Sequence, residues 1–181
     1  MTRGYFGIGV EDVSKPMNVG NLLRSAHAFG ASFFFTISPA VDVKSLRGSD
    51  TSGAFDHIPF YNFQKPDDLL LPDHTSLVGI EFLEDAIELP SFRHPARAVY
   101  VLGRERGNLS EELLARCDYL IKIPMKFCIN VGVAGALVMY DRLISLGKFA
   151  DRPVSETGNQ KPEIRNQKSE TEYGHILTSD L

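Results

Sequence analysis

Three short segments of the chain combine glycines with polar or charged side chains in an order that could build a ligand site. They are residues 18–24, 103–107 and 123–134. Glycine permits a ligand to approach the backbone closely, and a glycine-rich turn can present amide groups to it. Arg24, in the first segment, carries a guanidinium that can bind phosphate or stabilise developing negative charge. We therefore interpret the three segments as candidate parts of one site.

Each segment also has a purely structural explanation. A helix-capping Asn and a solvated Arg would account for residues 18–24, and a solvated glycine-rich turn would account for residues 103–107. In the third segment, Gly132 and Gly135 fall where the last helix is expected to begin. Because a glycine inside a helix costs roughly 1 kcal/mol relative to alanine, this pair predicts close packing against another backbone.

The elements that must position these segments alternate between strands and helices. Short apolar runs predict strands, and apolar residues at helical spacing predict helices. Strand–helix–strand order is typical of an α/β fold with a parallel sheet, in which ligands bind beyond the carboxyl ends of the strands. All three segments lie at such junctions. The predicted strands cover residues 5–10, 32–37, 57–63, 76–81, 98–102 and 119–123, and the predicted helices cover residues 18–29, 67–71, 131–149 and a segment that begins at 110.

Capping residues predict where the helices begin and end. Asn18, Ser110 and Asn130 precede helical patterns, and their side chains can accept a hydrogen bond from first-turn amides. Gly30 follows the first helix, at a position that commonly adopts the left-handed conformation. Between the second and third strands, residues 38–56 read as a long loop, which in a compact domain is often functional.

The composition of the 181 residues, with 43% hydrophobic residues and a net charge of −4, is that of a globular protein. We assign residues 1–150 to one domain and residues 151–181 to a polar, flexible tail with too few apolar residues to offset its ordering entropy. No run of 18 apolar residues predicts a membrane span. The two cysteines and five histidines lack metal-site spacing, so we expect no metal and a reduced, cytoplasmic protein.

The negative net charge argues against a protein whose whole surface binds nucleic acid, because phosphate contacts require Lys and Arg. A local basic cluster is still present over residues 93–106, which overlap the second segment. We interpret it as a solvated face that borders the candidate site. Its members are Arg93, His94, Arg97, Arg104 and Arg106.

Taken together, the three segments resemble the SpoU/TrmH branch of the SPOUT superfamily of RNA ribose methyltransferases, over roughly residues 5–148. The first family motif, N-x-G-x-x-x-R, is matched by Asn18, Gly20 and Arg24. The second, G-x-E-x-x-G, is matched by Gly103, Glu105 and Gly107 with one residue fewer between the last two. The third is matched by Asn130, Val131 and Ala134, behind an Ile-Pro-Met at 123–125, but Cys128 stands where the family has Ser.

The resemblance implies a parallel sheet flanked by helices, with a C-terminal trefoil knot over about residues 102–138. It also implies that S-adenosylmethionine binds in the knot, held largely by backbone groups, and that no metal takes part. The residues implied to bind this cofactor are Ile80, Leu102, Gly103, Gly107, Ile123, Pro124, Met125, Ile129, Asn130 and Ala134.

The implied reaction is methyl transfer to a ribose 2′-hydroxyl of tRNA or rRNA, in a homodimer with its active site at the interface. The resemblance makes Arg24, Asn18 and Glu105 the catalytic residues. We expect Arg24 to clamp a phosphate and stabilise the forming alkoxide, because a guanidinium with a pKa of roughly 12.5 or more is a poor base. Asn18 would fix the start of the first helix, and Glu105 would orient its turn.

Two other functions stay open on the sequence. An enzyme of the same fold could methylate a base nitrogen, and the mapped position of the methyl group would identify it. A non-catalytic RNA- or nucleotide-binding module is the other alternative, favoured by Cys128 and by the acidic balance. Such a module need not bind S-adenosylmethionine.

Overall fold

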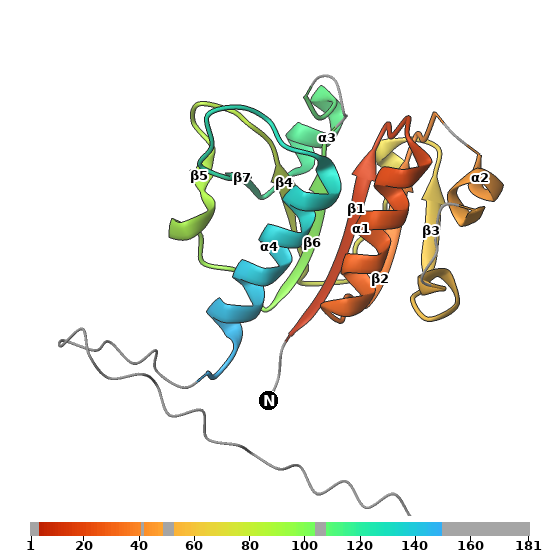
Figure 1. Ribbon diagram of the computed structural model, residues 1–181. Coiled ribbons are helices and arrows are strands. Elements are labelled where there is room, and N and C mark those ends of the chain that lie inside the picture. Colours follow the sequence, from red (N-terminus) through yellow and green to blue (C-terminus); the bar gives the residue numbers. More distant parts are fainter. Residues whose placement is uncertain (1–3, 41, 49–52, 104–107, 150–181) are drawn as a thin grey trace, which may run out of the picture. The chain divides into compact units, whose positions relative to one another are not determined.

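A seven-stranded parallel sheet forms the centre of the molecule (Figure 1). The computed structural model describes residues 4–40, 42–48, 53–103 and 108–149. The strand order is β3-β2-β1-β6-β4-β7-β5, and every neighbouring pair is parallel. The strands are β1 (Tyr5–Glu11), β2 (Phe33–Ile37), β3 (Phe60–Phe63), β4 (Ser76–Ile80), β5 (Ile87–Glu88), β6 (Arg97–Leu102) and β7 (Tyr119–Lys122).

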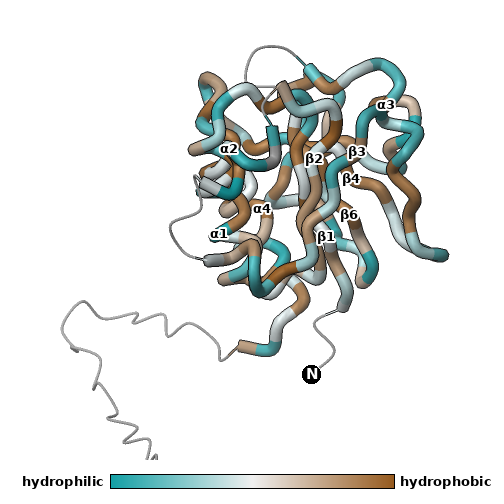
Figure 2. The backbone as a smooth tube through the Cα atoms, turned by 90° about the vertical axis from the view of Figure 1, so that its right-hand side faces the viewer, coloured by the Kyte–Doolittle hydropathy of each residue, from teal (hydrophilic) through white to brown (hydrophobic). Residues whose placement is uncertain are grey.

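Successive residues of the central strands point to opposite faces of the sheet, and both faces are buried. In β1 and β6 this places Ile8 and Tyr100 in one apolar cluster, whereas Val99 and Val101 belong to the cluster on the other face. Strands buried on both sides read as continuous apolar runs, which is why they could be identified from the sequence. Figure 2 shows the hydrophobic colouring concentrated along these inner strands.

Two long helices, α1 (Pro16–Ala28) and α4 (Val131–Leu146), lie side by side on one face of the sheet (Figure 1). The glycines of α4 permit this contact. A Cβ built on Gly135 would lie 2.2 Å from Leu22 Cδ1, and one built on Gly132 would lie 3.2 Å from Asn21 Cβ. The expected close packing is therefore present, with α1 as the partner. The shorter helix α3 (Glu111–Arg116) packs Leu113 into the cluster on the opposite face.

Several predicted boundaries change in the structure. The region 38–56 is not a simple loop, because it contains the helix α2 (Val43–Gly48) and the 3₁₀ turn Ala54–Asp56. In place of the helix predicted at residues 67–71, the chain forms a 3₁₀ turn at Pro66–Asp68. Another 3₁₀ turn covers Leu89–Ser91. The two-residue strand β5 was not predicted, since so short a run has no periodicity to read.

Three of the four predicted caps are confirmed. Ser110 accepts a hydrogen bond from Leu113 N at 3.3 Å, Asn130 accepts one from Gly132 N at 2.8 Å, and Gly30 has a φ of 75° after α1. The prediction that Asn18 is an N-cap is wrong. Helix α1 starts earlier, behind Lys15, with Pro16 at its first position, where the fixed φ of proline suits a helix start.

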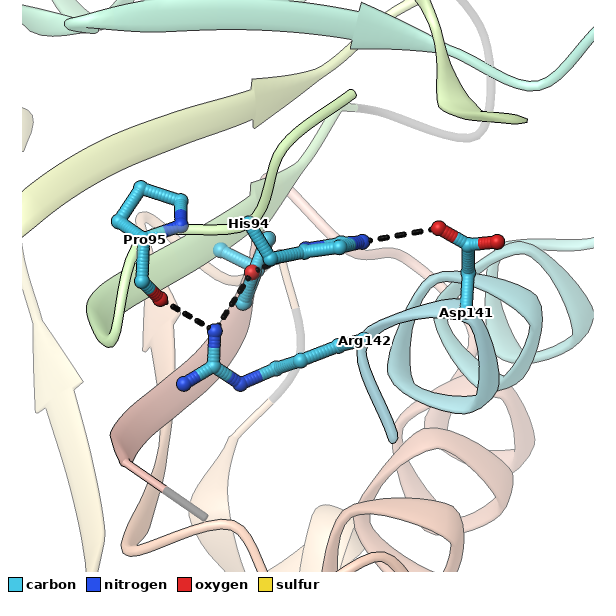
Figure 3. Close-up of polar contacts among 5 residues, drawn as sticks. His94, Pro95, Asp141 and Arg142 are labelled. Atoms are coloured by element: carbon cyan, nitrogen blue, oxygen red, sulfur yellow. Dashed lines mark hydrogen bonds and ion pairs between the residues drawn. The ribbon is translucent and has the colours of Figure 1, made fainter. Parts of the chain in front are cut away.

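A buried polar network fastens the second half of α4 to the segment that precedes β6 (Figure 3). Arg142 donates to the carbonyls of Pro95 at 2.6 Å and Ala96 at 2.9 Å, and to Tyr100 Oη at 3.2 Å. His94 contacts Tyr100 Oη through Nδ1 at 2.6 Å and Asp141 Oδ2 through Nε2 at 3.0 Å. The prediction that His94 belongs to a solvated basic face is therefore wrong, because only 4% of it is exposed.

The order of donors assigns the protons in this network. Because Arg142 donates to Tyr100 Oη, the hydroxyl of Tyr100 can give its own proton to Nδ1 of His94. The Nε2–H of His94 then donates to Asp141, and the imidazole is neutral. Burial lowers the pKa of His94 and raises the pKa of Tyr100 to about 12, and both shifts favour this neutral arrangement.

The observed architecture confirms the predicted α/β class with a parallel sheet flanked by helices. The trefoil knot stays a prediction. Glu105, Gly107, Arg104, Arg106 and the predicted tail 151–181 lie outside the described residues. In the part of the chain that the structure describes, no helix has both the length and the apolarity to cross a membrane.

Candidate functional site

A pocket opens at the carboxyl edge of the sheet, beyond the ends of β4, β6 and β7. The first turn of α4 and the segment leading to it form the other wall. Parallel strands bring their carboxyl ends to one edge, so residues far apart in sequence meet there. The lining residues are Ile80, Glu81, Phe82, Leu102, Gly103, Lys122, Ile123, Met125, Cys128, Ile129, Val131 and Ala134.

Seven of the ten residues expected to hold a cofactor line this pocket: Ile80, Leu102, Gly103, Ile123, Met125, Ile129 and Ala134. Pro124 lines an adjoining hollow that shares Phe82, Lys122 and Met125 with the pocket. Asn130 is not a lining residue and instead caps α4. The tenth residue, Gly107, and the expected catalytic residue Glu105 lie outside the described residues.

Two asparagines join the start of α1 to the start of α4. Asn130 Nδ2 donates to Asn18 Oδ1 at 2.8 Å, while Asn130 Oδ1 accepts from Gly132 N at 2.8 Å. These two bonds fix the orientation of the Asn130 amide. The side chain of Asn18, which is only 8% exposed, therefore connects the first segment of the sequence to the third beside the pocket.

Arg24 is not brought into the pocket of its own chain. It lies on α1, two turns beyond Pro16, and its side chain is exposed. It is absent from the described residues that line the pocket. The guanidinium is therefore free to reach a ligand that approaches α1 from outside, or a site on a neighbouring molecule.

Two carboxylates hold the junction between the second segment and α3. Glu81 Oε2 accepts from Leu109 N at 2.8 Å, and Glu11 Oε2 accepts from Ser110 N at 2.8 Å. Glu81 follows β4 and Glu11 ends β1, so two strands bind two consecutive amides. Glu11 is only 2% exposed, and such a buried carboxylate requires hydrogen-bond donors.

Sequence reasoning missed Glu81, Phe82, Lys122 and Val131 as lining residues. For Glu81 a signal was available, since it stands directly behind a predicted strand at the edge where ligands bind. Lys122 Nζ donates to the carbonyl of Glu84 at 2.5 Å. This bond links the end of β7 to the segment after β4. Cys128 lines the pocket with an exposed thiol side chain.

Among the described residues, the lining is mainly apolar, with one acidic and one basic side chain, Glu81 and Lys122. Such a lining suits a flat, partly apolar ligand that also carries charges of both signs. Gly103 adds a further constraint, because a Cβ at this position would lie 2.5 Å from Glu81 Oε2. Within the described residues, no group of three or more His, Cys, Asp or Glu side chains is placed to hold a metal ion.

The fold and pocket define an α/β protein with a ligand site at the carboxyl edge of a parallel sheet. The model of the SpoU rRNA methylase family matches residues 6–140. The chain belongs to the SpoU rRNA methylase family.

Known proteins that resemble the chain are methyltransferases. It is 26% identical, over 139 residues, to the mouse (Mus musculus) tRNA (guanosine(18)-2′-O)-methyltransferase TARBP1, which covers 71% of this chain and 9% of that protein. It is 29% identical, over 140 residues, to a Staphylococcus aureus protein described as a TrmH family tRNA/rRNA methyltransferase, covering 74% of this chain and 55% of the relative.

Among solved structures, the SpoU methyltransferase AviRb from Streptomyces viridochromogenes, in complex with AdoMet, superposes with a TM-score of 0.69 at 24% identity. The superposition covers 78% of this chain and 60% of AviRb. This likeness supports the shared fold. The chain thus spans about half the length of the S. aureus relative and a small part of the mouse protein.

Proposed function

We propose that the protein transfers a methyl group from S-adenosylmethionine to a ribose 2′-hydroxyl of RNA. The observation that carries the proposal is the pocket, in which the ends of three parallel strands meet the start of α4 in a chain of the SpoU family. Its apolar wall, formed by side chains such as Ile80 and Ile129, suits an adenine ring. Glu81 and Lys122 offer charges opposite to those of the sulfonium and the carboxylate of the donor.

When bound, S-adenosylmethionine supplies an electrophilic methyl group. The protein has to hold the ribose oxygen in line with that group and assist loss of the hydroxyl proton. Arg24 binds the neighbouring phosphate and stabilises negative charge on the reacting oxygen. Asn18 and Asn130 keep the starts of α1 and α4 together beside the donor, supported by their 2.8 Å hydrogen bond. Glu105 orients the turn that contains it.

We propose a homodimer as the active form. Helix α4 carries an apolar stripe with spacings of four, three and four residues, and the exposed fractions along it are 52% for Val133, 41% for Leu137, 48% for Tyr140 and 37% for Ile144. A contiguous exposed apolar surface of this kind is typical of a protein interface. The exposed position of Arg24, outside its own pocket, also supports a site completed by a second copy.

The trefoil knot over about residues 102–138 is part of the same proposal. Its support is the pocket wall, which combines the ends of β4, β6 and β7 with the start of α4 from the following segment. An experimental structure in which residues 123–130 run past the preceding turns without threading through them would contradict the knot.

We propose tRNA as the RNA, modified in the cytoplasm. The support is the name of the mouse relative, a tRNA (guanosine(18)-2′-O)-methyltransferase, and that of the S. aureus relative, a TrmH family tRNA/rRNA methyltransferase. The net charge of −4 requires local contacts rather than a wholly basic surface, and a dimer doubles any such local patch.

The test is transfer of tritiated methyl groups from S-adenosylmethionine into total tRNA and into rRNA by the purified chain, followed by mapping of the modified nucleotide. We expect label in tRNA and a site that resists alkaline cleavage. Label that leaves the site cleavable would indicate base methylation instead. If the protein neither transfers label nor binds the donor in calorimetry, it is a non-catalytic module.

The matched variants are Arg24→Ala and Arg24→Lys. We expect Arg24→Ala to lower the transfer rate about 10²- to 10³-fold, in the range found for loss of one charge-stabilising donor. The bidentate clamp predicts that Arg24→Lys is nearly as impaired, whereas a role of charge alone predicts partial activity. Donor affinity measured without RNA should be unchanged in both, since Arg24 is assigned to the RNA phosphate and the reacting oxygen rather than to the donor.

A further inference from the structure

Glu81 contacts two features of the site, the pocket and the junction that leads to α3. It lines the pocket, and it is the one carboxylate among the described residues that do so. It also accepts from Leu109 N at 2.8 Å, behind the second segment, and from Phe82 N at 3.0 Å. A ligand in the pocket and the turn that leads to α3 therefore share the same carboxylate group.

The local structure keeps this carboxylate against the pocket wall. Its two oxygens each accept from a backbone amide, so the side chain is held in one orientation. Gly103 leaves the space that the carboxylate occupies, since a Cβ there would lie 2.5 Å from Oε2. A carboxylate offers about four lone-pair sites, so two amide donors leave acceptor capacity and the negative charge for a ligand.

This inference rests on the proposed function. We propose that the charge of Glu81 makes the pocket bind the positively charged methyl donor more tightly than its neutral product. Methyl transfer converts the sulfonium of S-adenosylmethionine to the thioether of S-adenosylhomocysteine, while the adenosine, amino and carboxylate groups stay the same. The attraction of Glu81 is therefore larger for the donor than for the product. Glu81 acts as a specificity-determining residue that favours loading of donor and release of product.

The charge of Lys122 does not favour the donor over the product. Lys122 is the one basic side chain among the described lining residues, and its ammonium group is hydrogen-bonded to the carbonyl of Glu84. It repels a sulfonium and attracts a carboxylate, but the carboxylate is common to donor and product. Within the described lining, Glu81 is consequently the residue whose charge favours the donor.

Glu11 provides the matched control. It stands at the carboxyl end of a central strand, as Glu81 does, and it accepts from an amide of the same junction, Ser110 N, at 2.8 Å. Unlike Glu81, it does not line the pocket. Replacement of either residue by Gln removes one charge and keeps one carbonyl acceptor, which can serve Ser110 N in Glu11→Gln and Leu109 N in Glu81→Gln, although the bond from Phe82 N to Glu81 is lost. The pair of variants separates the charge seen by the ligand from the support of the turn.

The experiment is calorimetric titration of wild type, Glu81→Gln, Glu81→Asp and Glu11→Gln with S-adenosylmethionine and, separately, S-adenosylhomocysteine, without RNA. We expect the ratio of the two affinities to shift toward the product by about three- to tenfold in Glu81→Gln, the range for one charge at several ångströms in a partly solvated site. Glu81→Asp retains the charge and should retain most of the ratio. Glu11→Gln should leave it unchanged.

Equal weakening of both ligands in Glu81→Gln, or an equal change of the ratio in Glu11→Gln, would overturn the assignment and leave the proposed function standing. If the wild type binds neither ligand, it is the proposed function that fails. Thermal unfolding of each variant identifies one that has lost its fold. If Glu81→Gln has lost its fold, the wild type decides: attraction by the Glu81 charge predicts that added salt lowers the affinity for the donor more than that for the product, and an equal salt effect on both would overturn the assignment.

Discussion

The two edges of the sheet use polar side chains in opposite ways. At the carboxyl edge, Glu81 and Glu11 hold backbone amides of a turn and leave a pocket beside it. At the amino edge, His94, Tyr100 and Arg142 bind one another and the carbonyls before β6, and they are almost wholly buried. One edge is built to receive a ligand and the other to fix the framework.

Helix α4 connects the two edges. Its 16 residues span about 24 Å, starting at the pocket with the cap Asn130 and including Asp141 and Arg142 of the buried network. The difference between the two edges leads to opposite expectations for mutations. Changes at the amino edge should alter the free energy of unfolding and leave ligand affinity intact, whereas changes at the carboxyl edge should alter ligand affinity, even where they also lower stability.

The largest expected effect is that of Arg142→Met. The substitution keeps an unbranched side chain beside Phe6 but removes the donors to two carbonyls and to Tyr100 Oη. Each buried neutral acceptor left without its donor costs about 1–3 kcal/mol, so we expect the three lost bonds to lower stability by about 3 kcal/mol or more in urea unfolding. The donor affinity of the folded fraction should be within about twofold of wild type. A large loss of donor affinity at unchanged stability would contradict the assignment of the amino edge to the framework.

The next effect is that of Asn130→Ala at the carboxyl edge. The variant loses the N-cap bond to Gly132 and the bond to Asn18, and a lost cap costs about 1 kcal/mol. Because Val131 and Ala134 of the same first turn line the pocket, donor affinity in calorimetry should fall severalfold as well. Ser110→Ala, which removes the cap of α3, is the control with a similar loss of stability. Similar donor affinities in the two variants would contradict the expectation that Asn130 supports the pocket wall.

The smallest effect concerns pH and the amino edge. Burial lowers the pKa of His94, so the unfolded chain binds a proton more readily than the folded chain. The stabilisation from neutral His94 is complete above its usual pKa of 6.5 and is lost as the pH falls toward the lower folded value. The groups that face it are Asp141, Tyr100 and Arg142.

Urea unfolding measured from about pH 7.5 to about pH 5.5 tests this. Stability should decline with falling pH in the wild type and decline less in His94→Asn, which has no ionisable group at this position. Equal slopes for the two proteins would show that His94 does not carry the pH dependence.

The sequence was most informative about elements with a local pattern. The runs in β1, β2 and β6 are apolar on both faces, and the caps Ser110 and Asn130 act within their own helices. Such features depend on neighbours in the chain, so periodicity and residue type are enough to predict them. The same holds for Gly132 and Gly135, whose place in a helix already predicted a close partner.

The features that were missed depend on distant partners. Asn18 reads as a cap, but it is inside α1 and binds Asn130, 112 residues away. Glu11 binds the amide of Ser110 across 99 residues, and its sequence context is merely the end of a strand. His94 stands among basic residues, and its burial is set by Tyr100 and by Asp141, 47 residues later. No local pattern encodes such pairs, since the topology of the sheet creates them.

The anchoring of Leu109 and Ser110 by side chains from β4 and β1 has a practical consequence for engineering. The point where the chain enters α3 is therefore tied to two strands of the sheet. Substitutions between Gly103 and Leu109 should leave α3 in place. The proposed roles of Glu105 and Gly107 can thus be tested by mutation without displacing the helix that follows them.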